Sequence, residues 1–234
     1  MRMSRRLLLW TATARCAAPL SWSASGELNG YWEALQPPAA LRTTAGELPP
    51  LMSDARALYE ANQKARASGD LSFDTTVRCL PPGIPRLMTE PGPFEILQRD
   101  GYLYMLFQYQ HLNREILFRD RHAPLTLGRR FLGDSIARWD ADTLVIDTTG
   151  LKPGTLLDAV GLPHSKELHV VERYQLDKSG RELTDTVRIE DAKTYSQPWE
   201  TVLHFRRLGN TQIKEDVCVD RQPGWFDALK KSEP

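Results

Sequence analysis

The stretch Leu168-His-Val-Val-Glu-Arg-Tyr-Gln-Leu176 and, after a short break, Leu183-Thr-Asp-Thr-Val-Arg-Ile189 decides the fold of this chain. In both segments apolar residues alternate with polar ones, which is the period-two pattern of a β-strand that buries one face. Between them, Lys178-Ser-Gly180 supplies residues that favour a turn. The two segments are therefore expected to pair antiparallel as a β-hairpin that turns one face to a hydrophobic core.

The same alternation recurs along most of the chain after residue 93. Phe94 to Gln98 and Tyr102 to Gln110 flank Arg99-Asp-Gly101, which is a strong hairpin signal. Short turns at Asp140-Ala-Asp142 and Gly209-Asn210 link further neighbours directly, so their pairings are expected to be antiparallel. The remaining expected strands are Leu28 to Glu33, Arg114 to Arg119, Asp134 to Trp139, Thr143 to Thr149, Trp199 to Arg207 and Thr211 to Val219.

One segment follows a helical period instead. Ser53 is suited to cap a helix that runs from Asp54 to about Ala67, and Gly69-Asp70 is suited to end it. With about ten strands in all, the chain has enough to close a barrel and leave no sheet edge exposed. We therefore predict an all-β, antiparallel barrel with one short N-terminal helix, and a two-sheet sandwich is the alternative architecture.

Length and composition limit the function. At 234 residues the chain suits one domain, and its 30 basic side chains are balanced by 30 acidic ones with no basic block, so nucleic acid is not an expected partner. Residues 1–26 place Arg2, Arg5 and Arg6 before an apolar run and then small residues, the layout of an export signal. A poorly ordered cytoplasmic N-terminus is the alternative. No later segment approaches the ~20 apolar residues of a membrane helix. We expect a periplasmic or secreted protein, with one domain over residues 27–234 and no integral membrane segment.

Cys79 and Cys218 remain once the signal segment is removed. In an oxidising compartment such a pair is expected to form a disulfide, and two separate thiols are the alternative. Closing so long a loop would stabilise the fold by about 4 kcal/mol in the chain-entropy model. Because there is no Cys-x-x-Cys pattern, the two residues do not indicate a structural zinc site.

Gly30-Tyr31-Trp32, on the first expected strand, resembles the Gly-x-Trp motif that opens lipocalins and related calycin barrels. The resemblance implies a lipocalin-like barrel in which Trp32 plugs one end, with Arg206 or Arg207 packed over its ring by a cation–π contact. The helix and proline-rich loops after the first strand depart from that family's pattern, which leaves the strand order open.

A second resemblance spans most of the chain. Four segments are similar to a group of bacterial exported proteins of unassigned function: Cys79-Leu-Pro-Pro-Gly83, Pro93-Phe-Glu-Ile96, Gly133-Asp-Ser-Ile-Ala-Arg-Trp-Asp140 and Leu162 to Tyr174. This resemblance implies a shared fold and no particular chemistry.

Three polar side chains share a face with apolar neighbours in the hairpin that decides the fold. If Leu176 lies opposite Leu183, then Tyr174 faces Asp185 across the strand pair. Glu172 is then diagonal to Asp185 and within its reach. The alternation therefore predicts two acids and a phenol inside the barrel.

Buried carboxylates must be paired or have a raised pKa. A raised pKa of Glu172 or Asp185 would suit acid–base catalysis, with either group as the base. The alternative is a structural network in which Tyr174 or an arginine at the barrel rim, such as Arg173 or Arg188, satisfies the acids.

His164 lies in the loop that enters the strand bearing Glu172, so it is expected at the mouth of the barrel. There an imidazole can exchange a proton near neutral pH, and a solvated loop histidine is the alternative. His169 is an odd number of residues from Glu172, so the two are expected on opposite faces of the strand. The other histidines are scattered in sequence and indicate no metal site: His111, His122 and His204.

Asp134 and Asp147 form a second pair of acids, because a two-residue turn near Asp140 is expected to place them opposite one another across a hairpin. Two close carboxylates would share a proton or a cation. A turn longer by one residue would move one of them to the other face.

Aromatic side chains offer contact area to a flat or hydrophobic ligand. Trp139, Tyr104 and Trp199 are the expected ligand-binding residues, and core packing is the alternative explanation for them. The sequence has no Gly-x-Ser-x-Gly, Gly-x-Gly-x-x-Gly or phosphate-loop motif, which disfavours serine hydrolase, dinucleotide and nucleotide functions.

We therefore predict that the barrel binds a small hydrophobic or aromatic molecule, without a cofactor or a metal, and leave its oligomeric state open. Acid–base chemistry of a lyase, isomerase or hydratase fits such a pocket. The expected catalytic residues are His164, Glu172, Tyr174 and Asp185, with His164 or Tyr174 as the acid. The alternatives are a non-catalytic carrier of the cell envelope and a structural envelope protein with a filled barrel.

Overall fold

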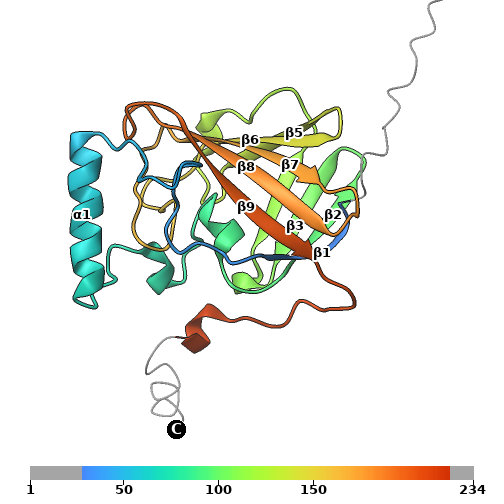
Figure 1. Ribbon diagram of the computed structural model, residues 1–234, viewed down its shortest axis with the longest axis horizontal. Helices are drawn as coiled ribbons and strands as arrows, with labels where there is room; N and C mark the ends of the chain where they lie inside the picture. The colour runs from blue at the N-terminus through green and yellow to red at the C-terminus, as the bar shows by residue number, and fades with distance from the viewer. Residues whose placement is uncertain (1–27, 222–234) are drawn as a thin grey trace, which may run out of the picture.

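The computed structural model describes residues 28–221, and the expected export signal lies outside them. In this part of the chain, nine strands close into one barrel with an α-helix beside it (Figure 1). The strands are β1 (Gly30–Ala34), β2 (Phe94–Arg99), β3 (Tyr102–Phe107), β4 (Asn113–Leu117), β5 (Asp134–Asp140), β6 (Thr143–Thr149), β7 (His169–Leu176), β8 (Glu182–Glu190) and β9 (Trp199–Arg207). The helix is α1 (Ser53–Ala67), and the 3₁₀ turns are η1 (Thr75–Arg78), η2 (Arg86–Thr89), η3 (Tyr109–His111), η4 (Leu125–Leu127) and η5 (Cys218–Arg221).

Strand pairing follows the order of the chain from β1 to β9, and β9 pairs back with β1 to close the barrel. The expected barrel is thus confirmed, and the sandwich alternative is excluded. Pairs are antiparallel except that β4 and β5 run parallel, through Ile116 with Ser135 and Leu117 with Ile136. The prediction of antiparallel pairing throughout was wrong here. The connection over residues 118–133 is long enough to carry the chain back to the end at which β4 began, so it does not force a hairpin.

The tenth expected strand, Thr211 to Val219, does not form, and neither does the hairpin at Gly209-Asn210. Because β9 already pairs with β1, the closed barrel offers this segment no edge to join. It runs instead along the outside and is held by single hydrogen bonds, such as the one from the Lys214 amide to Gln108 at 3.1 Å.

The expected disulfide between Cys79 and Cys218 is confirmed. It joins positions 139 residues apart whose Cα atoms are separated by 5.6 Å. The bond ties the segment after β9 to the loop that precedes η2.

Trp32 closes one end of the barrel, as the lipocalin resemblance implied. Its side chain is 0% exposed, and its indole Nε1 donates to the Leu28 carbonyl at 2.9 Å. The Arg207 guanidinium lies 4.4 Å from the ring centroid, so Arg207 is the residue that makes the cation–π contact. Arg206 points outward and forms an ion pair with Glu33.

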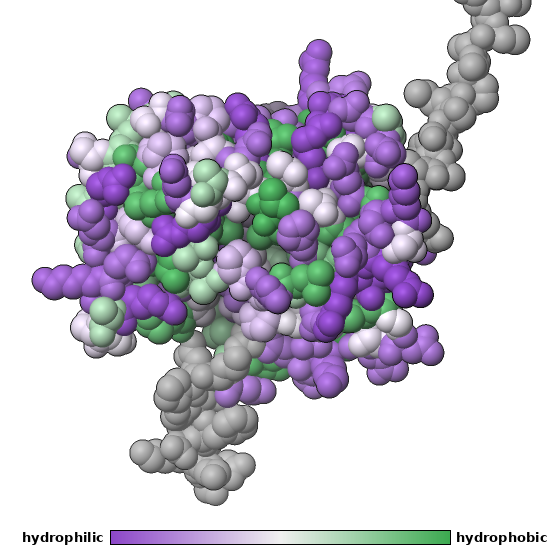
Figure 2. Space-filling model, in the orientation of Figure 1, coloured by the Kyte–Doolittle hydropathy of each residue, from purple (hydrophilic) through white to green (hydrophobic). Residues whose placement is uncertain are grey.

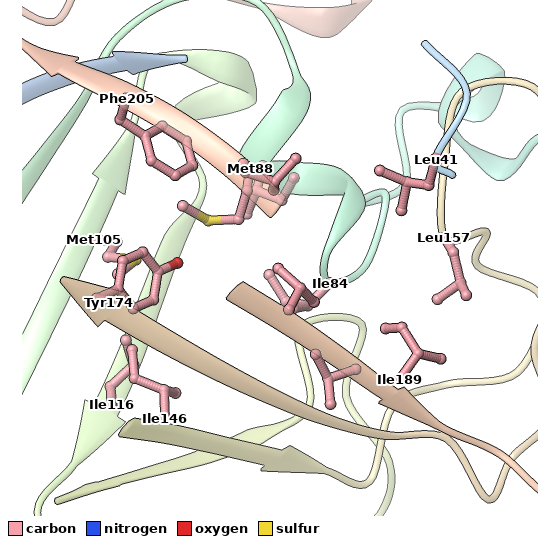
Figure 3. Close-up of a cluster of buried hydrophobic side chains, with 14 of the residues drawn as sticks. Leu41, Ile84, Met88, Met105, Ile116, Ile146, Leu157, Tyr174, Ile189 and Phe205 are labelled. Carbon is pink, nitrogen blue, oxygen red and sulfur yellow. The ribbon is translucent and has the colours of Figure 1, made fainter. Parts of the chain in front are cut away.

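The turn η2 and the loop before it lie on the side of the barrel that faces α1 (Figure 1). Ile84, Leu87 and Met88 are each 1% exposed. Figure 3 shows Met88 extending toward Phe205 and Tyr174 on the barrel strands, with Ile84 in the same buried cluster. The barrel interior is therefore occupied by packed side chains along much of its length.

Helix α1 differs from the prediction at its start. Ser53 is already its first helical residue, and Met52 occupies the capping position without a side-chain hydrogen bond. The helix buries Tyr59 and Asn62, and the Asn62 amide donates to the Gly161 carbonyl at 2.9 Å. No helix within the described residues is long and apolar enough to cross a membrane. On the face shown in Figure 2, small hydrophobic areas are separated by hydrophilic side chains.

Candidate functional site

The hairpin register expected from the sequence is confirmed. Tyr174 pairs with Asp185 and Glu172 pairs with Val187. Glu172 and Asp185 are 0% exposed and Tyr174 is 1% exposed, because all three point into the barrel. Three of the four expected catalytic residues therefore lie together.

Arg114 is the basic partner of this group, and sequence reasoning missed it. It reaches across the barrel from β4, and both of its terminal nitrogens donate to the carboxylate of Glu172, Nη1 at 2.9 Å. Nη2 also donates to the Thr148 hydroxyl at 2.9 Å, and Tyr174 donates to Glu172 at 2.9 Å. Burial disfavours the charge of Arg114, but the adjacent Glu172 carboxylate outweighs it and raises the arginine pKa. The guanidinium therefore keeps its charge inside the barrel, where it forms an ion pair with Glu172.

The two arginines expected at the rim are placed differently. Arg173 and Arg188 project from the outer face, where Arg173 pairs with Asp140 and Arg188 pairs with Glu190 and Glu200. Neither reaches the interior acids, so the structural network forms with Arg114 in their place.

Asp185 has no such partner. Neither of its carboxylate oxygens accepts a hydrogen bond of ordinary geometry within residues 28–221, although Tyr174 and the Arg173 amide lie close enough to lower its pKa in part. Burial, together with the negative charge of Glu172, raises the pKa of Asp185 well above its usual range. The neutral, protonated form of Asp185 is therefore favoured. Glu172 and Asp185 are both closed off from solvent.

His164 is not part of the interior group. Its Nε2 lies 2.7 Å from the Thr155 hydroxyl, and its Nδ1 lies 2.7 Å from the Ser165 carbonyl oxygen. Burial lowers the pKa of His164, which favours the neutral imidazole. The described contacts of His164 position the loop before β7 and do not connect it to Glu172 or Asp185.

The three expected ligand-binding aromatics do not converge. Trp139 lies near the end of β5 and packs partly buried against the core. Trp199 begins β9, is 4% exposed and packs edge-to-face on Tyr195 at 5.5 Å. Tyr104 points outward from β3, and its hydroxyl donates to Glu115 at 2.6 Å.

A polar cluster lies on the outer face of the barrel, where Asp134 and Asp147 project away from the core. Asp134 pairs with Thr149 and Ile136 pairs with Asp147, so the two acids are diagonal and not opposite as expected. A two-residue turn is present, but it consists of Ala141 and Asp142, so Asp140 pairs with Thr143. This register places Thr149, and not Asp147, opposite Asp134. His122 bridges the acids, with Nδ1 2.9 Å from Asp134 and Nε2 2.8 Å from Asp147.

Asp134 fixes the loop that carries His122. Arg119 Nη2 donates to both of its carboxylate oxygens, at 2.6 and 2.7 Å, and the Ala123 amide donates at 2.9 Å. Burial opposes ionisation of Asp134, but these hydrogen bonds outweigh it and lower its pKa. The loop is therefore anchored to β5 on both sides of the imidazole.

His169 extends the cluster along β7. Its Nε2 lies 2.9 Å from Oδ1 of Asp147, the oxygen that also meets His122, and its Nδ1 lies 3.2 Å from Glu190. The bond to Asp147 raises the pKa of His169. Burial opposes ionisation of Asp147, but hydrogen bonds from His169 and His122 outweigh it and lower its pKa. We call Arg119, Asp134, His122, Asp147, His169 and Glu190 the outer polar chain.

A groove of about 320 Å³ opens on the outer side of β5, β6 and β7, next to the outer polar chain. Ile136, Val145 and Val171 give it an apolar floor. The Asp147 side chain, 38% exposed, also lines it. Both imidazoles meet Oδ1 of Asp147, and Oδ2 has no hydrogen-bond partner within the described residues. The remaining lining residues are Arg119, Asp120, Ala137 and Arg138.

Sequence reasoning identified Asp134 and Asp147 but missed the histidines that join them. His169 could have been found, because it lies on the outward face of β7 and diagonal to Asp147 in the β6–β7 register. His122 could not, because it lies in an irregular loop that no periodicity places. Within residues 28–221, no group of three His, Cys, Asp or Glu side chains is arranged to hold a metal ion.

No protein-family model matches the chain, and no curated protein matches it. Among solved structures, a secretory abundant heat soluble (SAHS) protein from Ramazzottius varieornatus is similar with a TM-score of 0.37 and 9% identity, over 77% of this chain and 94% of that one. The N57A mutant of the fluorescent protein UnaG is similar with a TM-score of 0.34 and 13% identity, over 78% and 96%. Likenesses this distant carry no function, so the lipocalin-like barrel rests on the strand pairing of this chain itself.

Proposed function

We propose that the protein binds a small, largely apolar molecule in the groove over β5, β6 and β7 and exchanges a proton with it at Asp147, without a cofactor. One observation carries the proposal: Oδ1 of Asp147 is held by two imidazoles while Oδ2 is left without a partner beside an apolar floor. A carboxylate fixed in this way is oriented before the ligand arrives.

The hydrogen bonds restrict the chemistry. Because they lower its pKa, Asp147 is ionised near neutral pH and is a weak base. It suits a proton that the substrate already acidifies, such as one beside a carbonyl group or on a phenol. The raised pKa of His169 favours its protonated form beside Asp147. Lyase, isomerase and hydratase reactions need only such a proton acceptor and a donor.

Two other functions are the alternatives. In a carrier, the same groove would bind a ligand without turnover. In the second alternative, acid–base chemistry takes place inside the barrel at Glu172, Tyr174 and Asp185, and the unpartnered oxygens of Asp185 favour it. The interior reaction would require packed side chains to move, since the three groups are at most 1% exposed.

Methyl NMR of the Ile- and Val-labelled protein with a library of small aromatic and aliphatic compounds locates the binding site. Shifts of the Ile136, Val145 and Val171 methyl groups support the groove. Shifts of the interior Ile146 and Val187 methyl groups alone would place the ligand inside the barrel and contradict the proposal.

Deuterium incorporation from D₂O into the compounds that bind tests for proton transfer. We expect incorporation with the wild-type protein and its loss in Asp147→Asn, because the amide cannot accept the proton. Glu172→Gln serves as the control and should keep the exchange. The opposite pattern would assign the chemistry to the interior, and binding without exchange in every compound would leave a carrier.

We also propose that the protein is exported, supported by the Cys79–Cys218 disulfide, which persists in oxidising compartments. Intact mass measurement of protein from its native cells should give a chain that lacks the first residues and carries the disulfide. A full-length mass with all three cysteines as free thiols would refute export.

A further inference from the structure

We propose that the ligand of this groove carries a carboxylate and that Arg138 binds it; the inference rests on the function proposed for the groove. Arg138 is an exposed residue of β5 that lines the groove beside its cross-strand partner Val145. No hydrogen bond or ion pair joins its guanidinium to another residue within 28–221.

Two other arginines near the groove are paired with acids. Arg119 donates twice to Asp134, and Arg173 lies 3.0 Å from Asp140. Arg138 therefore differs from them in leaving its planar set of donors available, and a guanidinium matches the two oxygens of a carboxylate.

Two acids, Asp147 and Asp120, also line the groove, but they are placed differently from Arg138. Oδ1 of Asp147 is already held by the imidazoles on either side of it. Asp120 lies on the loop that forms the wall of the groove, whereas Arg138 lies on the same strand as Ile136 of the floor. An anion bound by Arg138 thus keeps the ligand body on apolar side chains, which is the arrangement that binds an amphiphilic acid.

Spacing along the strands sets the size of the ligand. Arg138 pairs with Val145, and Asp147 is two residues further along the same strand. At the usual rise of a β-strand, the backbone positions of Val145 and Asp147 are about 7 Å apart. A carboxylate and an exchangeable proton about that far apart describe a short aryl- or alkyl-substituted acid, with its carboxylate at Arg138 and its reacting end at Asp147.

Three probes of equal size and different charge test the inference: 3-phenylpropanoate, 3-phenylpropan-1-ol and 3-phenylpropan-1-amine. Their dissociation constants are measured from the Ile136, Val145 and Val171 methyl shifts. We expect the acid to bind about fivefold more tightly than the alcohol, as for a partly exposed charge pair, and 0.5 M salt to reduce the difference.

Arg138→Gln should remove the preference for the acid and leave the affinity of the alcohol unchanged, while Arg138→Lys should keep part of the preference. Arg206→Gln is the control on β9 and should behave as the wild type. Equal binding of acid and alcohol by the wild type, tightest binding of the amine, or a preference that survives Arg138→Gln would each overturn the carboxylate inference and leave the groove function standing. If no probe shifts the groove methyl groups, the groove function fails and the inference fails with it.

Discussion

Arg114→Met tests the account of the barrel interior most directly. The guanidinium is 1% exposed, and its nitrogens donate to Glu172, Thr148 and Ser135. Methionine fills much of the same space but leaves Glu172 as a buried charge without a cation, beside Asp185. Removing one partner of a buried ion pair costs about 3–5 kcal/mol. We expect the free energy of unfolding to fall by that amount.

Urea denaturation followed by tryptophan fluorescence measures the change, with the denaturation midpoint and the m-value fitted together. Arg206→Met removes an exposed ion pair with Glu33 and is the matched control, with an expected cost below about 1 kcal/mol. The double variant Arg114→Met, Glu172→Met removes both charges and should recover most of the lost stability, since apolar replacements of buried pairs are often neutral.

A loss below 1 kcal/mol in Arg114→Met would refute the reasoning, because a buried, unpaired Glu172 carboxylate should destabilise the fold by more than that. A double variant as unstable as the single one would show instead that Arg114 acts through its bonds to Thr148 and Ser135, and that its pairing with Glu172 contributes little.

Three further predictions concern single groups. Asp185→Asn should raise the melting temperature at pH 7 more than at pH 4, because the folded-state pKa of Asp185 is raised. Above the usual aspartate pKa the folded wild-type protein therefore binds more protons than the unfolded chain, and its stability falls as pH rises. Equal effects at both pH values would argue against it. Cys79→Ser with Cys218→Ser should lower the free energy of unfolding by about 4 kcal/mol, measured by urea titration without reductant, and no change would mean that the bond does not constrain the unfolded chain. The imidazole NMR titration of His169 should give a pKa above its usual value, falling in Asp147→Asn, and a titration unaffected by that substitution would contradict the bond between them.

Local sequence patterns predicted the interior acids well. Two-residue alternation and a short turn determine which side chains of one hairpin face each other, so Tyr174 opposite Asp185 followed from the strands that contain them. Arg114 did not follow, because it meets Glu172 across the barrel and not along a hairpin. Nothing local specifies which strand lies across a closed barrel, since this depends on how the whole sheet is staggered.

On the outer face, too, local sequence patterns predicted only part of the polar cluster. Asp134 and Asp147 were recognised as neighbours because a hairpin joins them. They were expected opposite one another and are diagonal, because the exact position of the turn sets the strand register. His122 comes from the long connection between β4 and β5, which also made that strand pair parallel. Long irregular connections carry no period, so both features escaped a reading based on periodicity.

The interior and outer polar groups meet at one seam of the barrel. Within residues 28–221, β4 and β5 pair through only two residue pairs, fewer than any other neighbours in the barrel. On the inside, Arg114 joins β4 to β5, β6 and β7 through Ser135, Thr148 and Glu172. On the outside, the loop after β4 is fixed to β5 and β6 through His122. Side-chain bonds thus replace backbone pairing at the place where the groove lies. Asp147 itself is held on the outer face by His122 and His169, so its position in the groove does not require the Arg114–Glu172 pair on the inside.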